Sequence, residues 1–160
     1  MCNAEEIMSI LKSFGSTNEN PSIDSVKESL KADIVRDKLI KSTDNSSREN
    51  ITVQYFPKNV DRRIVEDALR ELNFNYITGE SELSISTNAI WFGNDVPIED
   101  VKLVAYTLIR AGVEIKAIRP FPSTSSNRDR LIIQVGSDAE YQSREPLSVD
   151  EIQAADKFTR

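Results

Sequence analysis

The spacing of apolar residues predicts two helices ahead of the first strand. In the first helix, apolar side chains recur at helical spacing and Gly15 ends the run: Ile7, Ile10, Leu11 and Phe14. A second helix is predicted from about residue 22 to 41, with an apolar stripe of its own: Ile23, Val26, Leu30, Ile34 and Leu39. Residues 1–41 are therefore predicted to form an N-terminal helical segment. The segment 42–50 has no apolar side chain and is predicted to be a polar linker.

Two cycles of strand, helix and strand follow this linker. The strands "ITVQYF" (51–56) and "AIWFG" (89–93) are rich in β-branched and aromatic residues, which favour extended structure. Each precedes a helical stripe, and the apolar positions of the two helices align at a constant offset: Val60 with Val96, Val65 with Val101, Ala68 with Val104, and Leu72 with Leu108. A further strand follows each helix. The repetition predicts one unit present twice.

Two such units predict an α+β fold. They assemble into a ferredoxin-like domain, here over residues 51–138, in which duplicated βαβ units share one antiparallel or mixed sheet with both helices on one face. In that arrangement the strands 51–56 and 89–93 lie side by side at the centre of the sheet. A last strand is predicted at 130–136 from the apolar run "RLIIQVG".

The C-terminal segment, residues 139–160, carries a local helix signal. Ser148 and Glu151 have the spacing of a capping box, in which each residue caps the backbone N–H of the other. Leu147 and Ile152 have the spacing of the hydrophobic staple that accompanies such a cap. The pattern predicts a short capped helix that begins at residue 149.

Composition places the chain among globular proteins and limits the chemistry it can perform. Of 160 residues, 39% are hydrophobic and 29% are charged, with a net charge of -6. No run approaches the roughly 18 apolar residues of a membrane span, and acidic residues stand where a signal peptide has basic ones, so we expect a cytoplasmic protein with no membrane contact. Cys2 is the single cysteine and histidine is absent, which excludes an internal disulfide, a thiolate zinc cluster and histidine-based catalysis. We therefore expect no catalytic residues, no metal and no cofactor.

Clustered arginines are the candidates for an anion site. Arg119, Arg128 and Arg130 flank the loop "PSTSSN" between two predicted strands. Such arginines can keep a sheet edge soluble, or they can converge on a phosphate or carboxylate through their planar forks. Arg62 and Arg63 stand in the first turn of a predicted helix, where the macrodipole favours acids. They belong either to a salt-bridged helix face or to a binding site.

The aromatic residues of the two equivalent strands are a second candidate surface. Adjacent strand residues point to opposite faces, so either Trp91 or Phe92 faces away from the core. Exposed aromatic residues on a sheet can stack on single-stranded bases. However, the predicted domain has slightly more acidic than basic side chains, so we expect nucleic-acid binding only through a local basic patch.

The stretches "LIIQVGSD" (131–138) and "AIWFG…DVKLVAYTLIRAG" (89–112) resemble small bacterial βαβ-repeat domains of the SPOR and LytR C-terminal-like types. The likeness covers roughly residues 51 to 138 and lies in the hydrophobic rhythm and in a last strand that ends with Gly and Asp. A further similarity is to adaptor domains of prokaryotic signalling and defence proteins. The resemblance implies a domain that binds a partner and catalyses nothing.

These observations favour a non-catalytic protein-interaction or adaptor module, or a small subunit of a larger bacterial complex. The partner-binding residues would be those of the N-terminal stripes and the outward-facing tryptophan: Ile7, Leu11, Phe14, Ile23, Leu30 and Trp91. The two N-terminal helices could equally fold back on their own sheet. The alternative function is an anion- or nucleotide-binding sensor domain that uses the arginine cluster.

Overall fold

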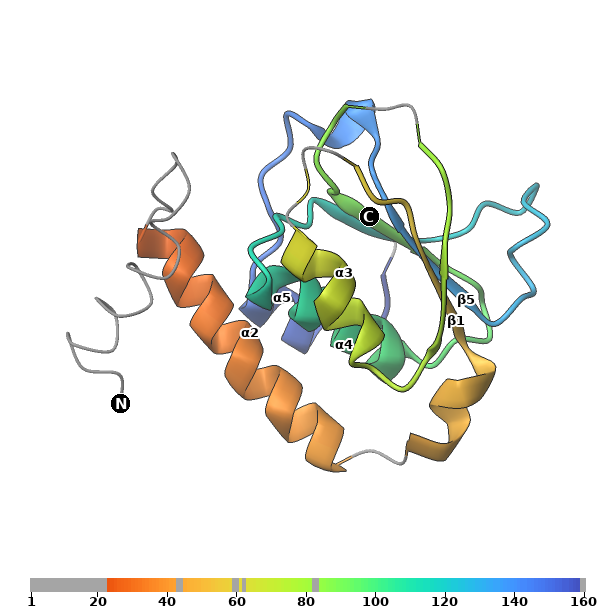
Figure 1. The fold of residues 1–160 in the computed structure, drawn as a ribbon, viewed down its shortest axis with the longest axis horizontal. Helices are drawn as coiled ribbons and strands as arrows, with labels where there is room; N and C mark the ends of the chain where they lie inside the picture. Colours follow the sequence, from red (N-terminus) through yellow and green to blue (C-terminus); the bar gives the residue numbers. More distant parts are fainter. Residues whose placement is uncertain (1–22, 43–44, 59–60, 62, 82–83, 159–160) are drawn as a thin grey trace.

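The computed structural model describes residues 23–42, 45–58, 61, 63–81 and 84–158. Figure 1 shows their arrangement, in which one sheet carries helices against it. The elements follow one another in this order: α2 (Ile23–Ser42), the 3₁₀ helix η1 (Asn45–Asn50), β1 (Thr52–Tyr55), α3 (Arg63–Arg70), β2 (Asn75–Thr78), β3 (Ala89–Phe92), α4 (Ile98–Arg110), β4 (Ala117–Pro120), β5 (Ile132–Gly136), the 3₁₀ helix η2 (Ala139–Tyr141) and α5 (Val149–Ala154).

The sheet has five strands in the order β2-β1-β5-β3-β4, and it is mixed. Strand β1 runs parallel to both β2 and β5, whereas β3 is antiparallel to β5 and parallel to β4. The α+β class and the mixed sheet predicted from the sequence are confirmed. In each strand–helix–strand cycle, the two strands that flank the helix are neighbours in the sheet and run parallel: β1 with β2, and β3 with β4.

The predicted ferredoxin-like strand order is wrong. It requires β1 and β3 to be neighbours, but β5 lies between them and pairs with both. The physical reason lies in the sequence of β5, where four of the five positions are buried. Neighbouring strands on both sides, β1 and β3, take up the backbone hydrogen bonds of this largely apolar strand, which a place at the edge of the sheet would leave open on one side.

The two helices of the cycles pack on one face of the sheet, as predicted. Figure 1 shows α3 and α4 on the same side of the strands. The aliphatic side chains expected in a common core are each at most 1% exposed and belong to one cluster: Val65, Leu69, Val101, Val104 and Leu108. The packing of these two helices was therefore predicted correctly, although the strand order was not.

Helix α4 is buried around its whole circumference. Every residue from Asp100 to Ile109 is buried, including three with polar side chains. Each of these three has a partner: Asp100 accepts from Arg48 Nε at 3.2 Å, Lys102 Nζ donates to the Gln153 carbonyl at 3.1 Å, and Thr107 Oγ1 donates to the Leu103 carbonyl at 2.8 Å. A helix that is largely apolar on all sides requires cover on all sides.

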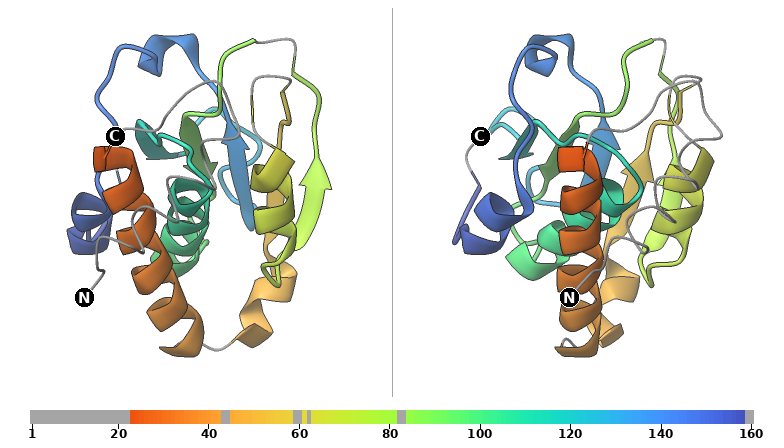
Figure 2. Two further views of the ribbon diagram at one scale, coloured as in Figure 1. Left: turned by 60° about the vertical axis from the view of Figure 1, so that its left-hand side comes forward. Right: turned by 90° about the vertical axis from the view of Figure 1, so that its left-hand side faces the viewer.

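Helix α2 provides part of this cover, so the predicted second N-terminal helix is confirmed and packs on its own chain. Figure 2 shows α2 alongside α4, and the two helices share a large contact. Ser29 Oγ donates to the Arg110 carbonyl at 2.9 Å, and Arg36 Nε donates to Thr107 Oγ1 at 3.1 Å. Of the predicted partner-binding residues here, Ile23 begins α2 and Leu30 is half-buried in it. Ile7, Leu11 and Phe14 lie outside the described residues.

The predicted apolar stripe of α2 is wrong at Ile34, which is 53% exposed. Val26 is buried as the stripe predicts, and the other buried positions are Ala32 and Arg36, which the stripe does not include. Ala32 is fully buried, and so small a side chain allows the helix backbones to approach closely. The buried Arg36 guanidinium is accommodated because it reaches Thr107.

The segment that composition predicted to be a linker contains η1, and this 3₁₀ helix is fixed to the core. Arg48 is only 2% exposed and forms an ion pair with Asp100 at 3.2 Å. The pKa of Asp100 is nevertheless raised, because burial outweighs the hydrogen bond and the charge of Arg48.

The predicted C-terminal helix is present as α5, and its capping box is confirmed. Ser148 Oγ accepts from the Glu151 backbone N–H at 3.1 Å, and Glu151 Oε1 accepts from the Ser148 backbone N–H at 3.4 Å. Among the described helices, none combines the length and the apolarity needed to cross a membrane.

Candidate functional site

A cavity of about 430 Å³ opens at the edge of the sheet where β1 and β5 end and β3 and β4 begin. Its wall combines segments that are far apart in the sequence. They are the start of α3 with Asp61, residues 85–88 before β3, residues 111–116 between α4 and β4, and Gln142 after η2. Most of these segments are loops at strand and helix ends, which is where binding residues are commonly held by a rigid scaffold.

Asp61 is the centre of a buried hydrogen-bond network in this wall. Its Oδ2 accepts from Tyr55 Oη at 2.9 Å and from Thr87 Oγ1 at 2.6 Å, and its Oδ1 accepts from the Thr87 backbone N–H at 2.9 Å. The Asp61 side chain is only 5% exposed. Both carboxylate oxygens are therefore occupied, and the network fixes the end of β1 to the segment before β3.

Lys58 lies behind Asp61, with its side chain 2% exposed. Its Nζ is 4.0 Å from Asp61 Oδ2, and it donates to the Phe56 carbonyl at 3.2 Å and to Thr87 Oγ1 at 3.4 Å. Burial lowers the pKa of Lys58, and the charge of Asp61 opposes this effect. Burial and the hydrogen bond to Asp61 raise the pKa of Tyr55. The site thus contains a desolvated ion pair that is held by neutral donors and acceptors.

Asn88 holds a second part of the wall. Its Nδ2 donates to the Asp138 carbonyl at 3.0 Å, and its Oδ1 accepts from the Asp138 backbone N–H at 3.0 Å. Its backbone N–H donates to the Gly136 carbonyl at 3.0 Å, and its carbonyl accepts from the Lys116 N–H at 2.7 Å. Because Asn88 joins the start of β3 to the end of β5 and the approach to β4, the wall is formed before any ligand arrives.

The mouth of the cavity carries polar groups with free hydrogen-bonding capacity. Lys116 Nζ donates to the Gln142 carbonyl at 2.6 Å, which leaves two of its three hydrogens. Ser86 and Glu114 are exposed and line the same cavity. Val65, Ile85 and Val113 supply apolar surface between these groups. The site can therefore bind polar and charged groups around an apolar centre.

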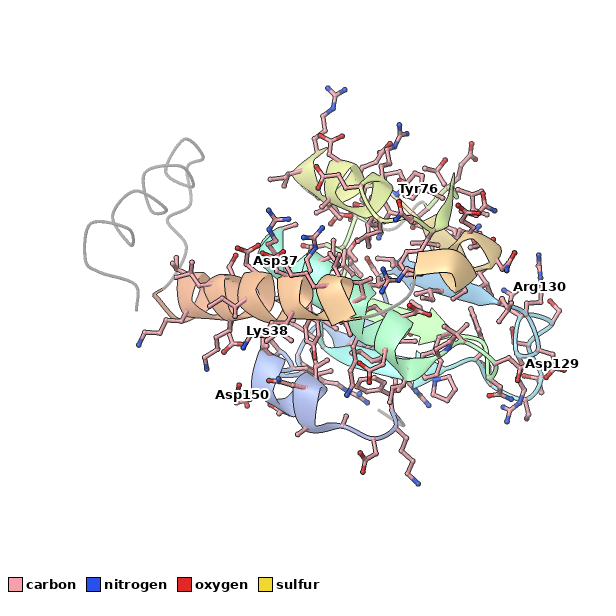
Figure 3. All side chains as sticks on the ribbon, turned by 90° about the horizontal axis from the view of Figure 1, so that it is seen from below. Asp37, Lys38, Tyr76, Asp129, Arg130 and Asp150 are labelled. Atoms are coloured by element: carbon pink, nitrogen blue, oxygen red, sulfur yellow. The ribbon has the colours of Figure 1, made fainter. Side chains whose placement is uncertain are left out.

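The predicted anion-site arginines have separate partners in the structure. Arg119 Nη1 donates to Tyr141 Oη at 2.7 Å, Arg128 Nη1 to the Phe121 carbonyl at 3.2 Å, and Arg130 Nη1 to Asn127 Oδ1 at 3.2 Å. Figure 3 shows Asp129 and Arg130 on the loop between β4 and β5, which projects away from the helices. Arg63 is exposed at the start of α3, and Arg62 lies outside the described residues. Anion binding by these arginines stays a prediction.

Trp91 is the aromatic residue of β3 that faces away from the helices. It is in register with Gln134 of β5 and Arg119 of β4, and it packs beside Tyr141 with ring centroids 6.4 Å apart. Together with Tyr141 it covers Ala89 and Ala117, in a small cluster separate from the main core. Phe92 packs against the main core. Trp91 is half-buried and remains partly accessible on the open face of the sheet.

The residues that form the cavity wall were not predicted as a site from the sequence. Lys58, Asp61, Thr87 and Asn88 carry no diagnostic motif. Their only local signal is the spacing of Lys58 and Asp61, where the Asp61 N–H closes a turn on the Lys58 carbonyl at 3.0 Å. Within the described ranges, no group of three or more acidic, histidine or cysteine side chains is placed to hold a metal ion.

Comparison with known proteins found no protein-family model, no curated protein and no solved structure that matches the chain. The resemblance to bacterial βαβ-repeat domains therefore stays a prediction.

Proposed function

We propose that the protein is a non-catalytic binding module that holds a small polar ligand in the cavity at the carboxyl ends of β1 and β5. The observation that carries this proposal is the prebuilt wall, in which Asp61, Thr87 and Asn88 are held by hydrogen bonds between distant segments. Ligand pockets are mostly preformed and range over about 300–1,000 Å³. The cavity of about 430 Å³ is within this range.

The chemistry of the wall supports binding and not catalysis. Asp61 accepts three hydrogen bonds and lies beside the Lys58 ammonium, so both of its carboxylate oxygens are already engaged within the wall. The Lys58 ammonium is directed to the Phe56 carbonyl and to Thr87. Buried ion pairs add little net stability, so their presence at a cavity supports a role in shaping that cavity.

A thermal-shift screen of small metabolites tests this proposal. A ligand at a hundredfold excess over its Kd stabilises the native state by about 2.7 kcal/mol, which for a chain of this size raises Tm by about 5–11 °C. Ser86→Phe places a bulky ring at the mouth and should abolish the shift. Ser143→Phe, the same change at an exposed position outside the cavity, should retain it. A shift that survives Ser86→Phe would place the ligand elsewhere.

A second candidate function is a protein-interaction module that uses the open face of the sheet. The observation that favours it is the outward position of Trp91 beside Arg119, because tryptophan and arginine dominate the energetics of protein interfaces. The partner would present an apolar centre and a carboxylate for Arg119. Because a lone cysteine requires no oxidising compartment, we also propose a cytoplasmic location.

Affinity purification with Trp91→Ser tests this second function. The variant should lose its partner, whereas Ile64→Ser should keep it, because Ile64 is an exposed apolar residue on α3, across the molecule from the open face. Equal recovery of the same partner by both variants would remove the open face from consideration.

A further inference from the structure

The free groups at the cavity mouth have opposite charges and come from one short segment. Glu114 and Lys116 are two residues apart and both line the cavity, while Ile115 between them is fully buried. Side chains at alternate positions of an extended segment point to the same side. Among the described residues, Glu114 and Lys116 form no ion pair with each other, so both charges remain available to a ligand that has charges of its own.

The region around Glu114 favours a cationic group. Helix α4 ends at Arg110, and its last turn leads directly into Ala111 and Gly112 of the cavity wall. The chain turns there because Gly112 adopts a φ of 93°, and the Gly112 and Val113 N–H groups close the helix on the Ile109 and Leu108 carbonyls. The carboxyl end of a helix carries a partial negative charge, and Glu114 adds a full one. An ammonium group would be stabilised there.

The region around Lys116 favours a carboxylate. One hydrogen of its ammonium group is used by the Gln142 carbonyl, and the others can donate to an anionic oxygen. Asp61, the other acid of the wall, accepts hydrogen bonds from the hydroxyls of Tyr55 and Thr87, and its charge is balanced by the Lys58 ammonium 4.0 Å away. It therefore repels a bound carboxylate less than a free aspartate would.

We infer that the ligand of this cavity is a small zwitterion of the amino-acid type, with its ammonium group at Glu114 and its carboxylate at Lys116. This inference rests on the proposed binding function of the same cavity. The apolar surface of Val65, Ile85 and Val113 receives the ligand's side chain. The arrangement favours a molecule with both charges over one that carries only an acid or only an amine.

Isothermal titration calorimetry of the full chain with the free L-amino acids tests the inference. At least one amino acid should bind, and both its amide, which lacks the carboxylate, and its deamino acid, which lacks the ammonium, should bind at least tenfold more weakly. Glu114→Gln should weaken binding of the amino acid at least tenfold and should not weaken binding of the deamino acid, which has no ammonium group to lose its partner. Glu145→Gln, at an exposed site outside the cavity, serves as the control and should bind like the native chain.

The outcomes separate this inference from the proposed function. If the cavity binds only compounds that lack one or both of these charges, such as carboxylic acids or sugars, the zwitterion inference is wrong and the binding function stands. If no compound of any class binds, the zwitterion inference and the proposed binding function are both wrong. Binding of an amino acid that Glu114→Gln does not affect would also overturn the assignment.

Discussion

Replacement of Asp61 by asparagine tests whether the cavity wall is held by a buried ion pair and its hydrogen bonds. Asparagine has the same shape but no charge, and one of its two terminal atoms is a donor. In one orientation of the amide, its NH₂ group would face the Thr87 backbone N–H, which can only donate. In the other orientation it would face the hydroxyls of Tyr55 and Thr87, which would have to turn and accept, and their own hydrogens would lose the carboxylate oxygen that they now donate to. The ammonium of Lys58 would also lose its only carboxylate within 4.0 Å among the described residues.

The expected loss of stability follows from these contacts. Leaving a buried donor without its acceptor costs about 1–3 kcal/mol, and breaking a buried ion pair by removing one partner costs about 3–5 kcal/mol in total. Since the Lys58 side chain is 2% exposed and that of Asp61 is 5% exposed, solvent can compensate little. We therefore expect Asp61→Asn to lower the free energy of unfolding by about 3–5 kcal/mol, equivalent to about 6–20 °C in Tm.

The loss should depend on pH through Lys58. Burial lowers its pKa below the ordinary value of 10.5, so between the lowered pKa and 10.5 the unfolded chain binds more protons, and stability rises with pH. Without Asp61 this pKa falls further. The deficit of Asp61→Asn should therefore be largest at neutral pH and shrink as the pH rises and Lys58 becomes neutral in both proteins.

Urea unfolding at pH 7 and at pH 9.5, followed by circular dichroism, measures this effect. The matched control is the double variant Lys58→Met/Asp61→Asn, which removes the uncompensated charge and should recover more than 1 kcal/mol of the loss at pH 7. A single variant within about 1 kcal/mol of the native chain, or a double variant no more stable than Asp61→Asn, would refute the ion-pair account of the wall.

Three further predictions concern the core. Tyr76→Phe should leave the free energy of unfolding within about 1 kcal/mol of the native value, because the buried Tyr76 hydroxyl makes no hydrogen bond of normal geometry within the described part of the chain and the Arg70 guanidinium, 5.2 Å from the ring centroid, can stay over the ring; a larger loss in urea unfolding would contradict this. Val104→Asp should unfold the protein, because it places an unpaired carboxylate at a fully buried position. Arg128→Ala, a change in the loop before β5, should alter stability by no more than about 0.5 kcal/mol. Far-ultraviolet circular dichroism and thermal melts compare the two variants. A chain that begins at residue 45 lacks α2 and uncovers α4, so it should bind a hydrophobic dye and melt without cooperativity; a cooperative melt within a few degrees of the full chain would show that α2 is not part of the core.

Local signals in the sequence predicted local structure well. Helix α2, the two cycle helices and the capping box of Ser148 and Glu151 were all predicted from spacings within a few residues, and all are present. Strand order depends on contacts between distant residues. The similar spacing of the two cycles predicted the ferredoxin-like order, with β1 beside β3, and that order is wrong. The apolar run of β5 was a better guide, because it is apolar at positions that face both sides of the sheet.

The burial pattern of α2 could be predicted only in part. Val26 is buried as the stripe requires, but Ile34 faces solvent and Arg36 is buried. Burial of an arginine depends on the partner that it reaches, here Thr107 of α4, which is 71 residues away in sequence. No window of the sequence contains that information.

The candidate site was not predictable for a related reason. Its wall is made where Asp61, Thr87 and Asn88 meet, and each residue alone is an ordinary polar residue at the end of a secondary-structure element. The arginines were more conspicuous in an acidic chain, yet Arg119 in β4 and Arg128 and Arg130 in the loop after it each have a separate partner. A sequence makes clusters of one residue type, such as these arginines, easy to notice. The cavity wall instead combines different residue types from separate segments.

A titration of the ¹⁵N-labelled protein with the amino acids, followed by backbone amide chemical shifts, tests the central claim most directly. Binding in the cavity should shift the amides of its rim, those of Ser86, Gly112, Glu114 and Lys116, and should leave those of the outer surface of α2 in place. Saturable shifts confined to these residues are the result that the account predicts. Shifts in another part of the protein, with the rim amides unchanged, would contradict it. So would rim amides that stay unchanged throughout a screen of small polar compounds.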